Sequence, residues 1–155
     1  MRKIDGMPLS LDETDLQILS LLRENARISL KAIAEQTYLS STAVSARIEK
    51  LEKNGYIEGY YTRVNSGSFG FTVKAYIWLE VEPIQKQEFY PYVRSCANVV
   101  ECDCVTGEYS MLLKVVFATT AELDRFIGEL QHFGKTKTQI VFSTPVEHRD
   151  ALPLR

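Results

Sequence analysis

Hydrophobic residues repeat with a helical period up to Gly55 and mostly with a period of two from Val73 onward. The first part predicts three helices, with apolar stripes of Leu16, Leu19 and Leu22, then Leu30, Ile33 and Ala34, then Val44, Ile48 and Leu51. Two capping signals compete at the first helix, namely Asp12 with Asp15 and Ser10 with Glu13. Ser29 is a candidate cap for the second helix, and Gly55 is placed to end the third.

The chain after Gly55 predicts a short strand, a linker and then the order β-α-β-β-α-β. The strand is expected from Tyr56 to Val64, and the linker at 65–70 is rich in small turn-forming residues. Later strands are expected at 73–81, 99–105, 110–117 and 136–146, and helices at 88–96 and from Thr119 to Gly134. Pro91 implies that the first of these helices starts late or is kinked. The predicted fold class is α+β, with a ferredoxin-like second half.

The strand that begins at Val73 has apolar residues on both faces. Ala75, Ile77, Leu79 and Val81 point one way, whereas Tyr76 and Trp78 point the other. Such a strand predicts a sheet covered on both sides, and a partner chain is one candidate for the second cover. We expect the face with Tyr76 and Trp78 to pack against the partner's sheet.

The second and third helices, with a tight turn at Tyr38-Leu39-Ser40, form a helix-turn-helix candidate. With the apolar stripe of the third helix turned inward, small polar residues near its start face outward and can approach base edges. Cations in the same region can pair with phosphates. The candidate DNA-binding residues are Arg27, Ser40, Ser41, Thr42, Ser45, Arg47 and Lys50, with Lys31 and Lys53 as further cations. The competing interpretation is a small helical bundle whose third helix has a solvated face.

Composition adds limits to this picture. The 155 residues are 45% hydrophobic and 25% charged, and 18 Lys and Arg against 20 Asp and Glu give a net charge of −2. The first 60 residues carry 8 cations and 9 acids, but residues 27–53 carry 5 cations and 3 acids, a local balance of +2. One copy is therefore expected to bind DNA weakly, and a symmetric assembly is needed for useful affinity.

Several classes of protein are disfavoured by what the sequence lacks. No apolar run approaches the roughly 20 residues of a membrane span, and the start MRKIDGMPLS has no secretion signal, so we expect a cytoplasmic protein without a membrane partner. Three cysteines argue against a disulfide framework. Cys102 and Cys104 share a strand face, but His132 and His148 are not at zinc-finger spacing, so the cysteines are expected in the core and no metal site is expected. No phosphate-loop or catalytic motif is present, and we expect neither cofactor nor catalytic residues.

The order and spacing of several motifs resemble the Lrp/AsnC, or feast/famine, family of transcription regulators. They are the segments Leu11–Asp15, Asn25–Ser29, Leu39–Ile57, Val100–Cys102 and Val105–Tyr109, followed by Leu112–Val115. The resemblance covers nearly the whole chain. It implies a winged-type helix-turn-helix in residues 1–60, a strand and linker in 61–72, and a ferredoxin-like domain in 73–155 that dimerises and binds a small effector, usually an amino acid. Dimers of many members assemble into octamers.

The resemblance also places an effector pocket at the hairpin and at the start of the last strand. The residues that it implies are Thr106, Gly107, Glu108, Tyr109, Ser110, Thr136 and Thr138. Ser110 stands where the family usually has an aspartate, and Gly134-Lys135 stands where it usually has Gly-Val. Because a buried ammonium group needs a charged or well-bonded partner, the loss of this acid weakens the expectation of an ordinary amino-acid effector, and Glu108 is a candidate substitute.

Our prediction is a homo-oligomeric DNA-binding regulator, without catalytic activity, whose effector shifts its affinity or assembly. One rival is a tetrapyrrole enzyme, because sirohaem decarboxylases resemble the same family. Its candidate residues are few, namely His132, His148, Arg94 and Arg125. A second rival is a metabolite-sensing module that contacts other proteins and binds no DNA.

Overall fold

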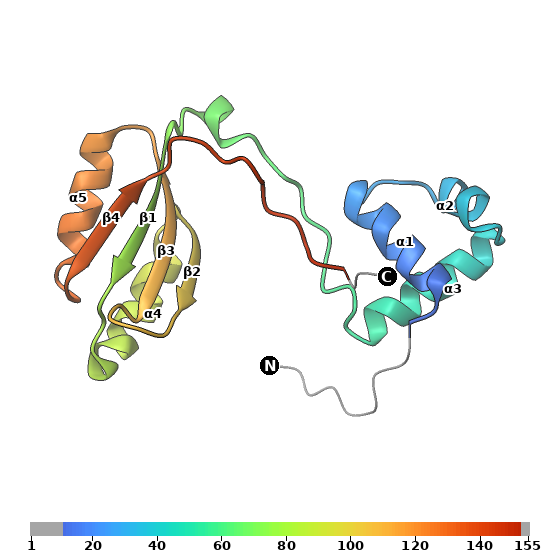
Figure 1. Cartoon of the computed structure of the whole chain (residues 1–155), viewed down its shortest axis with the longest axis horizontal. Helices are drawn as coiled ribbons and strands as arrows, with labels where there is room; N and C mark the ends of the chain where they lie inside the picture. Colours follow the sequence, from blue (N-terminus) through green and yellow to red (C-terminus); the bar gives the residue numbers. More distant parts are fainter. Residues whose placement is uncertain (1–10, 153–155) are drawn as a thin grey trace. The chain divides into compact units, whose positions relative to one another are not determined.

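The computed structural model describes residues 11–152, which form three helices followed by a four-stranded antiparallel sheet with two further helices (Figure 1). The helical elements are α1 (Glu13–Glu24), α2 (Leu30–Thr37), α3 (Ser41–Lys53), the 3-10 helices η1 (Ser66–Phe69) and η2 (Pro83–Gln85), α4 (Lys86–Ser95) and α5 (Thr120–Leu130). The strands are β1 (Val73–Leu79), β2 (Val99–Cys104), β3 (Met111–Phe117) and β4 (Thr136–Ile140). The α+β class and the β-α-β-β-α-β order are confirmed.

The chain divides into two compact units. Among the described residues, the helical unit contains 11–63 together with 148–152, and the sheet unit is Val64–Glu147. Each has its own apolar core.

In the helical unit, side-chain caps fix where each helix starts. Asp12 caps α1 in a capping box with Asp15, since each carboxylate accepts a hydrogen bond from the other residue's backbone N–H. Ser10, in the competing capping signal, lies outside the described residues. Ser29 and Ser40 cap α2 and α3 in the same way. Most residues of the predicted stripes lie in the core, where Ile33 and Val44 are fully buried beside Ile18. Leu16 and Leu30 were expected there but lie outside the core, and Leu30 is 41% exposed.

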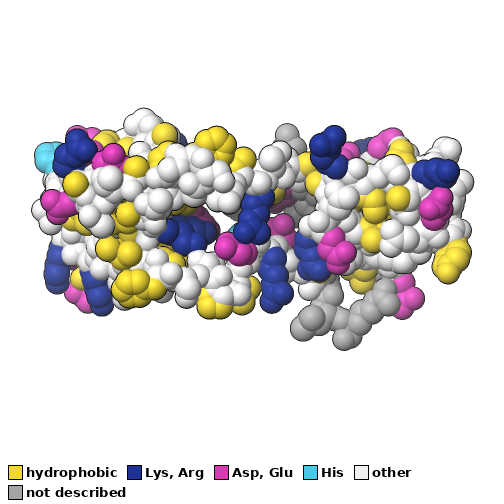
Figure 2. Space-filling model, turned by 90° about the horizontal axis from the view of Figure 1, so that it is seen from above, with side chains coloured by type: hydrophobic (Ala, Val, Ile, Leu, Met, Phe, Trp, Pro, Cys, Tyr) yellow, Lys and Arg dark blue, Asp and Glu magenta, His cyan; other side chains and the backbone are white. Residues whose placement is uncertain are grey.

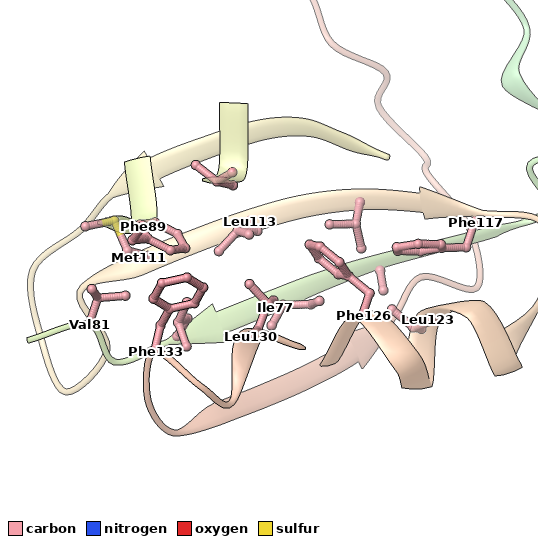
Figure 3. Close-up of a cluster of buried hydrophobic side chains, with 14 residues drawn as sticks. Ile77, Val81, Phe89, Met111, Leu113, Phe117, Leu123, Phe126, Leu130 and Phe133 are labelled. Carbon is pink, nitrogen blue, oxygen red and sulfur yellow. The ribbon is translucent and has the colours of Figure 1, made fainter. Parts of the chain in front are cut away.

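The sheet unit has the strand order β2-β3-β1-β4, and α4 and α5 cover one face of it (Figure 1). Its core lies between sheet and helices: Ile77 and Leu113 from the strands meet Phe89 of α4 and Leu130 of α5 (Figure 3). All four of these side chains are completely buried. Because side chains alternate along a strand, the other face of the sheet carries Tyr76, Trp78 and their neighbours.

The strand expected from Tyr56 to Val64 was wrong. Residues 57–65 lie outside every described helix and strand, although Tyr56 and Val64 bracket an alternating pattern. A strand needs a neighbouring edge for its backbone hydrogen bonds, and the backbone N–H groups of Tyr56 and Ile57 instead donate to the carbonyl oxygen of Leu51 at the end of α3. The alternation of apolar and polar residues therefore indicated an extended backbone, but it did not show whether a neighbouring strand was available to pair with it.

The prediction for the first helix of the sheet unit was also partly wrong. α4 begins at Lys86, five residues before Pro91, rather than late, and Pro91 lies inside it. Phe89 and Val93 are buried on one face of α4, so burial on both sides of Pro91 outweighs the lost hydrogen bond. The last strand ends at Ile140, earlier than the expected residue 146.

The C-terminal segment belongs to the helical unit, whereas the sequence assigned residues up to 155 to the second domain. Leu152 packs against the helical core, and a guanidinium nitrogen of Arg23 donates to the carbonyl oxygen of Asp150 at 3.3 Å. The sequence could not predict this contact, because Leu152 is a single apolar residue outside any periodic pattern. Within residues 11–152, every helix falls short of the length and apolar character that a membrane crossing requires.

Candidate DNA interface and effector site

The outward face of α3 is polar and exposed. Val44 and Leu51 are turned into the core at 0% and 2% exposure, whereas Ser41, Thr42 and Lys50 are exposed. Ser45 is half-buried, and its hydroxyl donates to the Glu49 carboxylate at 3.3 Å. The predicted division of this helix into an apolar inner face and a polar outer face is therefore present in the structure.

The start of α3 has the geometry of an anion-binding helix end. Ser40 caps the helix: its side-chain oxygen accepts from the backbone N–H of Ala43 at 3.2 Å. The helical ladder begins only at Val44, whose N–H donates to the carbonyl oxygen of Ser40. The backbone N–H groups of Ser41 and Thr42 come before this ladder, and such groups form the positive end of the helix dipole. A phosphate at this end is favoured by both features.

Arg47 is placed differently from the other candidate residues. Its guanidinium bonds to Asp15 at 2.6 Å and to Asp12 at 2.7 Å, in place of the expected free position beside DNA. Hydrogen bonds from the Asp15 backbone and from Arg47 hold the pKa of Asp12 below its usual value, and the two carboxylates raise the pKa of Arg47. The arginine therefore joins α3 to the first turn of α1, because both acids of that capping box accept its hydrogen bonds.

This pairing changes the charge available for phosphates. With Arg47 engaged, the span 27–53 retains Arg27, Lys31, Lys50 and Lys53 against three acids. Arg27, Lys31 and Lys50 are exposed, and Figure 2 shows cationic and anionic side chains interspersed over the helical unit in that view. The small excess of cations that remains in this span favours weak binding by a single copy.

The hairpin between β2 and β3 lies next to the start of β4, as the resemblance implied. Cys104 pairs with Met111 to close the hairpin, and β1 stands between β3 and β4. Thr136 and Thr138 pair with Leu79 and Ile77 of β1. Of the expected effector residues, Thr106, Gly107 and Glu108 are exposed and the other four are half-buried.

Ser110 makes a structural contact in the position of the family's usual acid. Its hydroxyl oxygen accepts from the backbone N–H of Val81 at 2.9 Å and donates to the carbonyl oxygen of the same residue at 3.1 Å. Its own backbone N–H donates to Leu79 at 3.2 Å. The hydroxyl is thereby committed to fastening the hairpin to the end of β1.

Charged and aromatic side chains lie beside the Ser110–Val81 hydrogen bonds. The ammonium of Lys135 meets a carboxylate oxygen of Glu108 at 3.2 Å and stands 5.9 Å from the ring centre of Tyr109. The hydrogen bond with Glu108 raises the pKa of Lys135. The Tyr109 ring is 6.5 Å from that of Trp78. Lys135 was not among the residues expected to bind effector, and its place directly after Gly134, where the sequence departs from the family, is the signal that could have identified it.

Gly134 holds the backbone of this region close to β1. A Cβ atom there would stand 1.8 Å from the carbonyl oxygen of Glu80, and its φ is +151°. The next residue accepts a hydrogen bond at its carbonyl oxygen from the Glu80 N–H at 3.0 Å. Only glycine permits this approach, which sets Lys135 and Thr136 against the hairpin.

The face of the sheet opposite α4 and α5, here called the open face, is partly apolar. Trp78 pairs across the strands with Leu112 on one side and with Lys137 on the other. Tyr76, Trp78, Leu112 and Val116 are all half-buried in the single chain. The indole N–H of Trp78 donates to Gln139 at 3.3 Å.

The cysteines do not form a metal site. Within residues 11–152, no cluster of three or more His, Cys, Asp or Glu side chains is arranged to hold a metal ion. Cys102 packs against the core, and burial raises its pKa to about 11. Cys104 is exposed, so its expected place in the core was wrong: it is the last residue of the edge strand β2.

Comparisons with known proteins agree with this two-part arrangement. Residues 11–58 match the family described as winged helix-turn-helix DNA-binding, and residues 74–151 match the Lrp/AsnC ligand binding domain. The HTH-type transcriptional regulator LrpA of Bacillus subtilis is 31% identical over 84% of this chain and 97% of its own length. A second relative from that organism, the uncharacterised HTH-type regulator YezC, is 33% identical over 89% of this chain and 98% of its own.

Two solved structures show the same fold with an amino acid bound. One is a transcriptional regulator from Neisseria meningitidis in complex with L-Met, with a TM-score of 0.84 and 27% identity over 93% of this chain and 97% of that one. The other is a feast or famine regulatory protein from Mycobacterium tuberculosis complexed with L-methionine, with a TM-score of 0.83 and 26% identity over 93% of this chain and 100% of that one.

Proposed function

The chain belongs to the Lrp/AsnC family of transcription regulators, and we propose that it binds double-stranded DNA as a homodimer and senses an amino acid through its sheet unit. The helix-turn-helix supplies the DNA-binding activity. Binding would use the exposed face and start of α3, with Ser40, Ser41, Thr42, Ser45 and Lys50 at the groove and Arg27 at the phosphates. The observation that carries this assignment is the polar outer face of α3 above the buried Val44 and Leu51.

Selection of bound fragments from the source genome, followed by salt titration, tests the DNA assignment. We expect recovery of a limited set of fragments whose affinity falls steeply with salt, because phosphate neutralisation releases counterions. Binding without salt dependence, or no binding at all, would support the rival metabolite-sensing module instead.

The homodimer rests on the open face. Tyr76, Trp78, Leu112 and Val116 form an apolar set on the sheet face opposite α4 and α5, and a second sheet would supply a matching cover. Sedimentation of the wild type should show a dimer or a multiple of it. The variant Trp78→Lys should dissociate it, whereas Ile84→Lys, at an exposed residue of η2 outside the sheet, should leave the size unchanged.

The effector site rests on Glu108 and Lys135, which bring one negative and one positive group together beside the half-buried Tyr109. An amino acid carries both charges at its α-carbon, so its ammonium can replace Lys135 at Glu108 and its carboxylate can bind Lys135 or the N–H groups of the Gly107 turn. Thr106, Ser110, Thr136 and Thr138 would complete the lining. The L-Met complexes of two relatives support this ligand class.

Isothermal titration with a panel of L-amino acids tests the effector site. We expect Glu108→Gln to weaken the binding of the preferred amino acid. Asp124→Asn is the matched control, because the exposed Asp124 lies on α5, which follows the end of β3 opposite the hairpin. Equal binding by wild type and Glu108→Gln would contradict the role of Glu108.

We further propose that the chain has no catalytic activity, in line with relatives named as regulators. An absorption spectrum recorded after mixing with a tetrapyrrole separates this proposal from the tetrapyrrole-enzyme rival, and a stoichiometric spectral shift with loss of carboxylate would establish the rival.

A further inference from the structure

Tyr38, in the turn between α2 and α3, combines an unusual backbone with complete exposure. Its φ and ψ are 56° and 33°, in the left-handed region, and within residues 11–152 it is the single residue other than glycine with a positive φ. Its side chain is 96% exposed. The backbone has a clear function, because the Tyr38 N–H donates to the carbonyl oxygen of Ala34 and closes α2.

The side chain has no such function within the described fold. The left-handed conformation disfavours any residue with a Cβ atom, and glycine or asparagine adopts it most readily. The next residue, Leu39, is the one that packs against the helical core. A large aromatic ring at 38 therefore costs conformational free energy without burying its own surface, so folding alone does not account for it.

The position of Tyr38 indicates what the ring contacts. It precedes the α3 cap Ser40 by two residues, next to the exposed Ser41 and Thr42. In helix-turn-helix proteins the start of the second helix enters the major groove while the preceding helix crosses the sugar-phosphate backbone, so the intervening turn faces that backbone. Tyrosine hydroxyls are among the groups that bond to phosphate oxygens.

We infer that Tyr38 is a DNA-contact residue: its hydroxyl donates a hydrogen bond to a backbone phosphate beside the groove that receives α3, and its ring covers the adjoining deoxyribose. This inference rests on the DNA binding proposed above. Because tyrosine is neutral, its contact adds affinity without neutralising a phosphate. That property distinguishes it from Lys50, whose removal also lowers the salt dependence of binding.

The test uses the full-length protein and a fragment that the wild type binds. Tyr38→Phe removes the hydroxyl alone and should weaken binding about fivefold. Tyr38→Gly removes the whole side chain and should weaken it about tenfold or more, with an unchanged slope of log affinity against log salt. Phe142→Gly removes an equally exposed aromatic ring from the sheet unit and should leave affinity unchanged.

Folding and assembly are measured on the same samples. Tyr38→Gly relieves the left-handed strain, so its thermal midpoint should equal or exceed that of the wild type, and a gain in stability with a loss of DNA affinity is the combination that a purely structural residue does not produce. If Tyr38→Gly melts lower, Tyr38→Asn, which tolerates the same backbone, replaces it in the affinity measurement.

Three results would overturn the inference while the wild type still binds DNA. They are unchanged affinity in Tyr38→Gly, a reduced salt slope, and a changed oligomer size in light scattering, which would make Tyr38 a subunit contact. Failure of the wild type to bind any fragment would instead overturn the DNA assignment itself.

Discussion

Arg47, in the middle of α3, bonds to Asp15, in the first turn of α1, at 2.6 Å, and the Asp15 side chain is only 10% exposed. The same guanidinium reaches Asp12, the cap of α1, and both acids already form the capping box. One arginine thus connects α3, the helix proposed to enter the DNA groove, to the start of α1. The charge that the sequence assigned to phosphate is used to set the orientation of α3.

Replacing Arg47 with alanine should destabilise the helical unit by about 1 to 2 kcal/mol, because it leaves the largely buried Asp15 carboxylate without a cationic partner. DNA affinity should fall with it, but the slope of log affinity against log salt should stay that of the wild type. Chemical denaturation and salt titration measure the two effects. Asp15→Asn should reproduce both, and a reduced slope in Arg47→Ala would show that Arg47 neutralises a phosphate after all.

Replacing Lys50 with alanine should lower the salt slope and leave stability almost unchanged, the reverse of the result expected for Arg47→Ala. Lys50 is exposed on α3, so its loss should leave stability within about 0.5 kcal/mol of the wild type. The salt slope should decrease by about 0.9 for each bound subunit, since one phosphate contact is lost. Fluorescence anisotropy at several salt concentrations measures this change. An unchanged slope would place Lys50 outside the interface.

The capping box should be sensitive to acid. The pKa of Asp12 is lowered in the folded state, so its stabilisation is fully present above its ordinary pKa of 3.8 and is lost as the pH falls through and below that value. Thermal midpoints of wild type and Asp12→Asn, measured from pH 7 down to pH 2, should therefore differ at neutral pH, and the difference should shrink as the pH falls below 3.8. A difference that stays constant over this whole range would contradict the role of the Asp12 charge.

Two glycines of the sheet unit should respond to alanine with opposite signs. Gly134→Ala places a Cβ atom 1.8 Å from a Glu80 backbone oxygen and should destabilise the sheet unit by about 2 to 4 kcal/mol. Gly128→Ala lies in the exposed face of α5 with no atom within 4 Å and should stabilise by about 0.5 to 1 kcal/mol. Urea unfolding measures both. Equal stabilities would mean that the backbone at Gly134 relaxes freely.

Local signals were enough to locate most elements. The caps Asp12, Ser29 and Thr119 and the apolar spacing of Val44 and Leu51 depend on residues three or four apart, so they are readable without the fold. The strand expected at 56–64 shows where this fails, because alternation specifies side-chain faces but supplies no partner for the backbone.

The sequence by itself therefore determined the order of the five α-helices and four strands of residues 11–152, most of the apolar residues in the two cores and the polar face of α3, since periodicity and capping act over one or two turns. Tertiary structure alone decided which charges are available to a ligand. Arg47 is paired with acids 32 and 35 residues away, Ser110 with the backbone of Val81, and Lys135 with Glu108. These partners are distant in sequence, and spacing carries no information about which opposite charges or polar groups packing brings within hydrogen-bond distance.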